Sequence, residues 1–77
     1  MSNKLIKSSI VGQFEKMQKD SIFYGSTIIR IVKKDTGLNN LFSDTILRRM
    51  RELREDEIIN YRCINPKKSE YIKMEVL

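Results

Sequence analysis

Residues 43–71 constrain the fold more than any other part of the chain, because a helical pattern there passes directly into a hairpin pattern. At about 100° per residue, the apolar side chains of a helix over 43–55 share one side with the stem of Arg54: Ile46, Leu47, Met50 and Leu53. Mostly charged side chains fall on the other: Asp44, Thr45, Arg48, Arg49 and Glu52. One face therefore packs, and an arginine-rich face is exposed to a partner.

The start of this helix is marked by two residues. We expect Ser43 to be the N-cap, because its hydroxyl can accept a hydrogen bond from an otherwise unpaired backbone amide, which is worth ~1 kcal/mol. Asp44 then places negative charge near the positive end of the helix dipole. The pattern predicts a helix that ends near Glu55.

Two extended segments follow, over 58–64 and 70–76, and Pro66 in the turn between them prevents continued pairing. Alternation in the second segment places Ile72 with other apolar residues on one face and Tyr71 and Lys73 on the other. The sequence therefore predicts a C-terminal hairpin with a lysine-rich tip.

The N-terminal half predicts two more helices. The spacing of Ile10, Phe14 and Met17 indicates a helix over 9–19, and residues 1–8 are either a tail or an extension of it. Residues 22–24 are too short for a helix and suit a small strand or an extended link. Ser26 or Thr27 can cap a second helix, which stops before Gly37. Its β-branched run leaves a buried strand as the alternative.

Composition limits the function. The 77 residues suit one small domain, and the net charge of +5 with pI near 9.6 favours a polyanionic partner. One cysteine and no histidine exclude an intrachain disulfide, a usual zinc site and histidine-dependent nucleophiles. We expect no enzymatic activity, no metal and no cofactor. No apolar run approaches the ~18–20 residues that span a bilayer, so we expect a cytoplasmic protein without membrane contact.

The predicted element order is similar to that of the winged helix-turn-helix domain. The run from Ser43 to Tyr61, followed by Tyr71, resembles the recognition helix and wing of small bacterial, archaeal and phage regulators, with paired arginines, a Leu-Arg-Glu end and Ile-x-Tyr entering the wing. The resemblance implies an α+β fold over residues 9–77, with three helices and a C-terminal hairpin wing. Where such regulators carry glycine this chain has Glu57, so a left-handed residue is expected at Asp56 or Glu57, unless the helix end avoids one.

The resemblance also implies sequence-specific binding of double-stranded DNA and a role in transcription regulation, with the helix in the major groove. Base edges would be read by Thr45, Arg48 and Arg49. The DNA backbone or minor groove would be held by Ser43, Arg51, Arg62, Lys67, Lys68 and Lys73. Because one such domain buries little surface on DNA, we expect a homodimer or several copies.

Two alternatives remain open at this point. The arginines could belong to a solvated face, in which Arg48 pairs with Glu52 and Arg51 with Glu55 at i, i+4. The fold could instead be a protein-binding module, such as a subunit of a larger assembly or a phage-encoded inhibitor. Its interface would then include exposed apolar residues: Leu5, Ile6 or Ile22.

Overall fold

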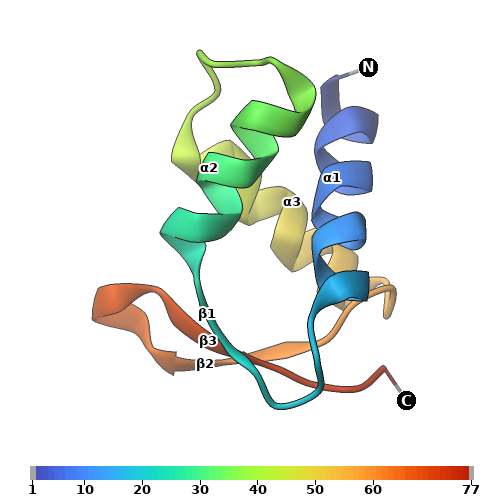
Figure 1. Ribbon diagram of the computed structural model, residues 1–77, viewed down its shortest axis with the longest axis vertical. Coiled ribbons are helices and arrows are strands. Elements are labelled where there is room, and N and C mark those ends of the chain that lie inside the picture. Colours follow the sequence, from blue (N-terminus) through green and yellow to red (C-terminus); the bar gives the residue numbers. More distant parts are fainter. Residues whose placement is uncertain (1, 77) are drawn as a thin grey trace.

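Three helices lie above a small antiparallel sheet in the computed structural model, which makes the protein α+β (Figure 1). Residues 2–76 are described. Met1 and Leu77, at the outer ends of the predicted ranges 1–8 and 9–77, lie outside them. In chain order the elements are α1 (Ser2–Lys16), β1 (Ile22–Tyr24), α2 (Gly25–Thr36), α3 (Ser43–Glu55), β2 (Tyr61–Asn65), a 3₁₀ turn (Pro66–Lys68) and β3 (Glu70–Lys73).

The sheet has the order β1-β3-β2, so the hairpin gains a third strand from the N-terminal half of the chain. Tyr71 of β3 lies between Phe23 of β1 and Cys63 of β2. The triplet at 22–24 is therefore a strand rather than a link. Both hairpin strands are shorter than the sequence predicts: β2 begins at Tyr61 and β3 ends at Lys73.

The core fills the space between the helices and the sheet. Four aromatic rings join α1 to the strands, and Phe14 packs edge-on against Phe23 with ring centroids 5.1 Å apart. Phe23 stacks on Tyr71 at 5.4 Å. Tyr61 meets Tyr71 edge-on at 5.3 Å. The remaining core side chains are aliphatic or methionine: Ile6, Ile10, Ile28, Val32, Ile46, Met50, Leu53 and Ile59.

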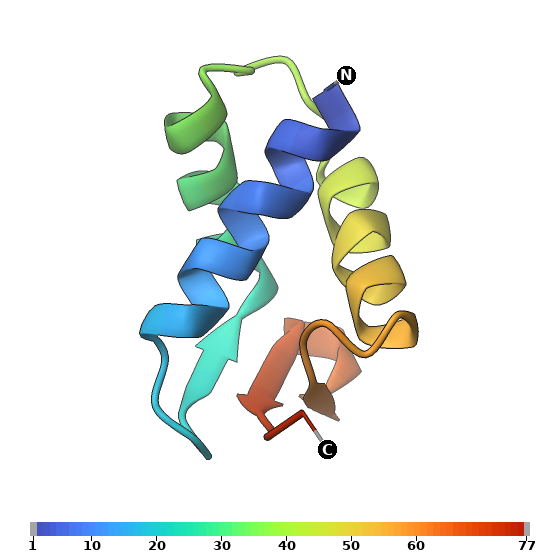
Figure 2. The same cartoon turned by 90° about the vertical axis from the view of Figure 1, so that its right-hand side faces the viewer.

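α1 is longer at its start than the pattern over 9–19 predicts, and it ends earlier. It begins at Ser2, so the first residues are an extension of the helix and not a tail. Ile6 is fully buried, one helical turn before Ile10, which explains why the extension is ordered. The expectation that Ile6 forms an exposed interface is therefore wrong, whereas Leu5 is exposed. α1 packs on both α2 and α3 (Figure 2).

α2 is a helix, which settles the choice between helix and strand. It begins at Gly25, and no side chain caps it, so the predicted caps at Ser26 or Thr27 are wrong. The amide of Gly25 donates to the Ser69 carbonyl at 2.8 Å, which ties the helix start to the hairpin turn. Gly37 has a φ of 72° and its amide donates to the Lys33 carbonyl, confirming the predicted stop.

α3 has the predicted bounds but not the predicted cap. Phe42 occupies the N-cap position without a side-chain hydrogen bond, and Ser43 is the first helical residue. At the other end Glu57 has a φ of 62°, so it adopts the left-handed conformation expected at Asp56 or Glu57. No helix in the described part of the chain is both long and apolar enough to cross a membrane.

Candidate nucleic-acid interface

The outer face of α3 carries an exposed arginine stripe. Arg48 and Arg51 are both exposed, one turn apart. The Arg48 Nη2 atom lies 3.1 Å from the Asp44 Oδ2 atom, and these side chains are 55% and 71% exposed. Arg48 therefore pairs with Asp44 and not with Glu52. Because such a pair in solvent is worth ~0–1 kcal/mol, an incoming anion can displace the carboxylate.

The hairpin tip is a short 3₁₀ turn that exposes two lysines. The Asn65 side chain accepts a hydrogen bond from the Lys67 amide at 3.1 Å and so holds the start of the turn. Ser69 closes the turn with a φ of 48°. Lys67 and Lys68 are exposed on the tip, which projects beyond the helices (Figure 1).

The hairpin tip and the middle of α3 meet at Gly25. A Cβ atom added to Gly25 would lie 3.1 Å from the Ser69 Cβ atom and 3.3 Å from the Leu47 Cδ2 atom. Leu47 directly precedes Arg48, and Ser69 directly follows Lys68. Gly25 therefore lies beside both Leu47 and Ser69, which brings the middle of α3 and the end of the hairpin turn to the same glycine.

β2 also lies against α3. The Arg54 guanidinium lies over the Tyr61 ring, 4.7 Å from its centroid. Burial raises the pKa of the Tyr61 phenol, and the charges of Arg54 and Arg51 oppose this shift in part. The Arg54 contact therefore holds the start of β2 against the last turn of α3.

α2 adds cations that the sequence analysis did not include in the site. Arg30, Lys33 and Lys34 line a shallow, open depression of about 580 Å³ that also reaches Asn39 and Ser43 at the start of α3. Of the described residues that line it, none is acidic. The i, i+3, i+4 spacing of these cations places them on one side of α2, and this spacing was the signal that could have identified them.

Arg49 does not belong to the exposed face, and the expectation that it does is wrong. Its side chain is 17% exposed, and its Nη1 atom lies 2.6 Å from the Glu52 Oε2 atom. Glu52 also pairs with Lys7 of α1 at 3.2 Å. Arg49, followed by Lys7, holds the pKa of the Glu52 carboxyl below its ordinary value of 4.5. This network links α3 to α1.

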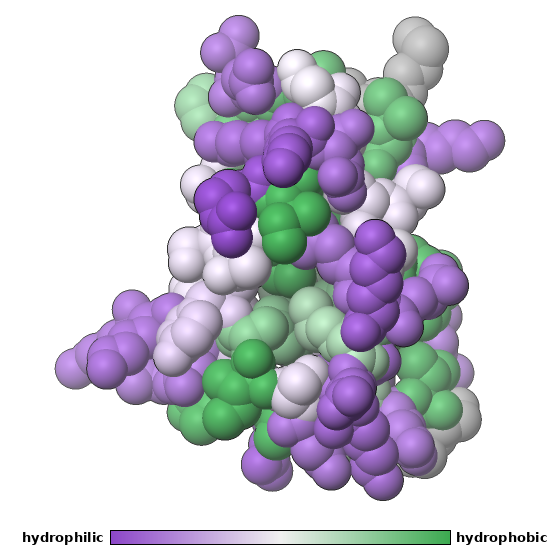
Figure 3. Space-filling view, in the orientation of Figure 1, coloured by the Kyte–Doolittle hydropathy of each residue, from purple (hydrophilic) through white to green (hydrophobic). Residues whose placement is uncertain are grey.

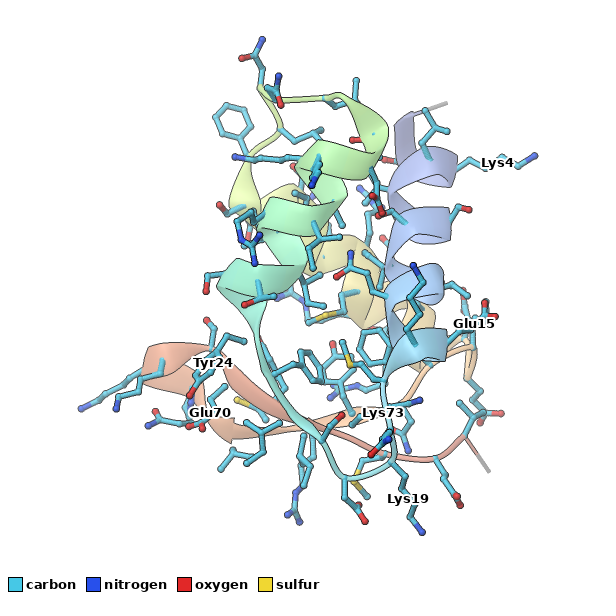
Figure 4. All side chains as sticks on the ribbon, viewed as in Figure 1. Lys4, Glu15, Lys19, Tyr24, Glu70 and Lys73 are labelled. Carbon is cyan, nitrogen blue, oxygen red and sulfur yellow. The ribbon has the colours of Figure 1, made fainter. Side chains whose placement is uncertain are left out.

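Lys73 likewise lies inside the fold. Its Nζ atom donates to the carbonyls of Phe14 and Met17 at 2.7 and 2.6 Å, at the end of α1 (Figure 4). It shares the inward side of β3 with Tyr71, because strand residues two apart point the same way. Its expected place on the wing surface is therefore wrong. Its charge compensates the negative end of the α1 dipole instead.

The predicted site residues fall into three groups. Five are exposed on α3 or the hairpin tip: Ser43, Arg48, Arg51, Lys67 and Lys68. Thr45 is half-buried beside them. Arg62 is exposed on the side of the sheet that faces away from the helices, opposite Ile72. Arg49 and Lys73 are engaged within the fold.

No protein-family model, curated protein or solved structure matches the chain. Within residues 2–76, acidic, cysteine and histidine side chains form no group of three that could hold a metal ion. Cations lie at the surface of α3, the hairpin tip and α2, and a polyanion is the ligand that such cations attract.

Proposed function

We propose that this protein is a winged helix protein that binds double-stranded DNA sequence-specifically and regulates transcription. α3 would enter the major groove, and the hairpin tip would hold the backbone or minor groove beside it. The observation that supports the proposal is that Gly25 lies beside both Leu47 and Ser69, the chain neighbours of Arg48 and Lys68, so that one duplex would contact both segments.

Within this proposal, Arg48 and Thr45 read base edges. A bidentate arginine contact to guanine discriminates by ~1–3 kcal/mol. Phosphates are held by Ser43, Arg51, Lys67, Lys68, Arg30, Lys34 and the half-buried Lys33. Arg62 is left out because it lies on the side of the sheet that faces away from the helices. Arg49 and Lys73 are left out, because their charged groups already have partners inside the protein.

Substitution of Asp44 should strengthen DNA binding, whereas loss of the arginines should weaken it. Its carboxylate would lie near DNA and holds Arg48 in the free protein. Asp44→Asn removes both the repulsion and the competing ion pair while keeping the size of the side chain. We expect this variant to bind DNA more tightly than the native chain, whereas a purely solvated arginine face would show no change.

The main experiment is fluorescence anisotropy with random-sequence duplex across a salt series. We expect binding that weakens steeply with salt through counterion release, and a slope that falls by up to about 2 in Arg48→Ala/Arg51→Ala. The matched control is Lys4→Ala/Lys16→Ala, which removes the same charge from exposed positions on α1. Its binding should fall much less.

Sequence preference needs a separate measurement, selection of bound duplexes from a random pool. We expect the native chain to enrich a motif and Arg48→Ala to lose preference at one position of it. Lys67→Ala/Lys68→Ala should instead weaken binding uniformly across sequences. Enrichment of no motif would leave DNA binding in place but contradict sequence-specific recognition.

A different result would favour the protein-binding alternative. If the native chain binds no duplex at about 50 mM salt, where counterion release favours association, the DNA proposal fails. The fold would then be better assigned to a module that binds another protein, with exposed Leu5 in its interface.

A further inference from the structure

The side of the sheet that faces away from the helices carries large apolar side chains that the described chain leaves exposed. Phe23, Tyr61 and Tyr71 point into the core, so the residues that alternate with them point outward. Ile22 is 57% exposed and Tyr24 is 43% exposed. Figure 3 shows apolar surface among polar side chains at the sheet end of the molecule. A sheet face of this kind suits an interface.

Two opposite charges lie on this outer face in neighbouring rows. The strand register aligns Ile22, Ile72 and Arg62 across the three strands, and it aligns Tyr24 with Glu70 in the row nearer the hairpin tip. Within residues 2–76, neither Arg62 nor Glu70 forms an ion pair. The Glu70 carboxylate accepts a long hydrogen bond of 3.5 Å from the Tyr24 hydroxyl (Figure 4).

We propose that this outer sheet face binds the same face of a second copy of the chain, forming a two-fold symmetric dimer. A two-fold axis between the two rows sets Ile22 against Tyr24 of the second copy. It also brings Arg62 within reach of Glu70 of the second copy, and the reciprocal contact forms by symmetry. An axis through the Ile22 row would instead oppose two Arg62 side chains. The charges therefore select the first arrangement.

The dimer geometry also suits the proposed DNA binding. Only the spacing of the α3 helices described in this paragraph rests on the proposed function. The sheet lies at one end of the longest axis of the molecule, which is 30 Å (Figure 1). Two copies joined at this end place their α3 helices on the order of 30 Å apart, near the ~34 Å helical repeat of DNA. α3 lies on one side of this axis (Figure 2), so a two-fold axis along the shortest dimension keeps both copies on the same side.

Sedimentation equilibrium without DNA tests the interface. We expect the native chain to shift from monomer to dimer with rising concentration, and Arg62→Glu or Glu70→Arg alone to remain monomeric, because each puts like charges together. An equimolar mixture of these two variants should associate again, since each contact then joins opposite charges. Arg30→Glu, with the same charge change on α2, should dimerise like the native chain.

A second variant tests the apolar part of the face. Ile22→Lys changes an exposed side chain, so the fold should persist, as circular dichroism would verify, while dimerisation is lost. A native chain that stays monomeric at all concentrations, or a mixture no more associated than its components, overturns the dimer. A monomer that binds DNA would overturn this inference and keep the proposed function. A dimer that binds no DNA would support this inference and overturn the proposed function.

Discussion

We expect Lys73→Met to destabilise the protein by about 2 kcal/mol. The ammonium group donates two short hydrogen bonds, at 2.7 and 2.6 Å, to carbonyls at the end of α1. A hydrogen bond to a charged group contributes ~1.5–3 kcal/mol, and a cation at a helix C-terminus adds ~0.3–1 kcal/mol. Lys73 is only half-buried, so water can replace part of this loss. Methionine keeps the aliphatic stem, which isolates the effect of the charge.

Urea denaturation followed by circular dichroism measures this change in the free energy of unfolding. In a thermal melt of the same variant, the melting temperature should fall by roughly 8–16 °C. Lys68→Met is the matched control, because it removes the same charge from the exposed hairpin tip and should shift stability by less than ~0.5 kcal/mol. If Lys73→Met costs no more than this control, the ammonium group is free in solution. Lys73 would then be available as a wing contact, as the sequence alone suggests.

Four further variants test stability. Gly12→Ala should stabilise α1 by about 0.5–1 kcal/mol, because an added Cβ meets no atom within 4 Å. Gly25→Ala should destabilise the protein by roughly 1–2 kcal/mol, since the added Cβ would lie 3.1 Å from the Ser69 side chain in the hairpin turn. The midpoints of urea denaturation of Gly12→Ala and Gly25→Ala should therefore shift in opposite directions. Tyr61→Phe should add up to ~1 kcal/mol by removing a buried hydroxyl that lacks a partner. Burial raises the pKa of Tyr61 in the folded protein. The folded state is therefore favoured below the ordinary pKa of 10.0, and this contribution to the free energy of unfolding is lost as pH rises through the raised pKa. Melting curves of Tyr61→Phe at alkaline pH should lack this loss. Arg49 lowers the pKa of Glu52, so the ion pairs of Glu52 stabilise the fold above pH 4.5 and lose this effect as pH falls through the lowered pKa. In Glu52→Gln the melting temperature should therefore depend less on pH in the acidic range.

Local signals in the sequence predicted the features that depend on neighbouring residues. The spacing of Ile46, Met50 and Leu53 predicts which face of α3 is buried, and all three side chains are in the core. Gly37 ends α2 as expected, because glycine adopts the left-handed backbone without steric cost. Glu57 shows that the chain keeps this backbone conformation even without glycine.

Contacts between distant segments could not be predicted in the same way. Whether Arg49 is exposed depends on where α1 crosses α3, and helical periodicity does not contain that information. Lys73 reaches a carbonyl 59 residues away, at Phe14. Alternation divides β3 into two faces but does not say which one meets the helices. The pairing of β1 with β3 determines which face of β3 meets the helices. Lys73 lies on that face, where the carbonyls at the end of α1 accept its hydrogen bonds.

The most direct test of the DNA-binding surface is a titration of the ¹⁵N-labelled protein with duplex DNA, followed by amide chemical shifts. We expect the largest changes on residues 43–51 of α3 and on Lys67 and Lys68 at the hairpin tip, with smaller changes along α2 near Arg30. Changes concentrated on the outer sheet face around Ile72, or on α1 around the exposed Leu5, would contradict the proposed DNA-binding surface.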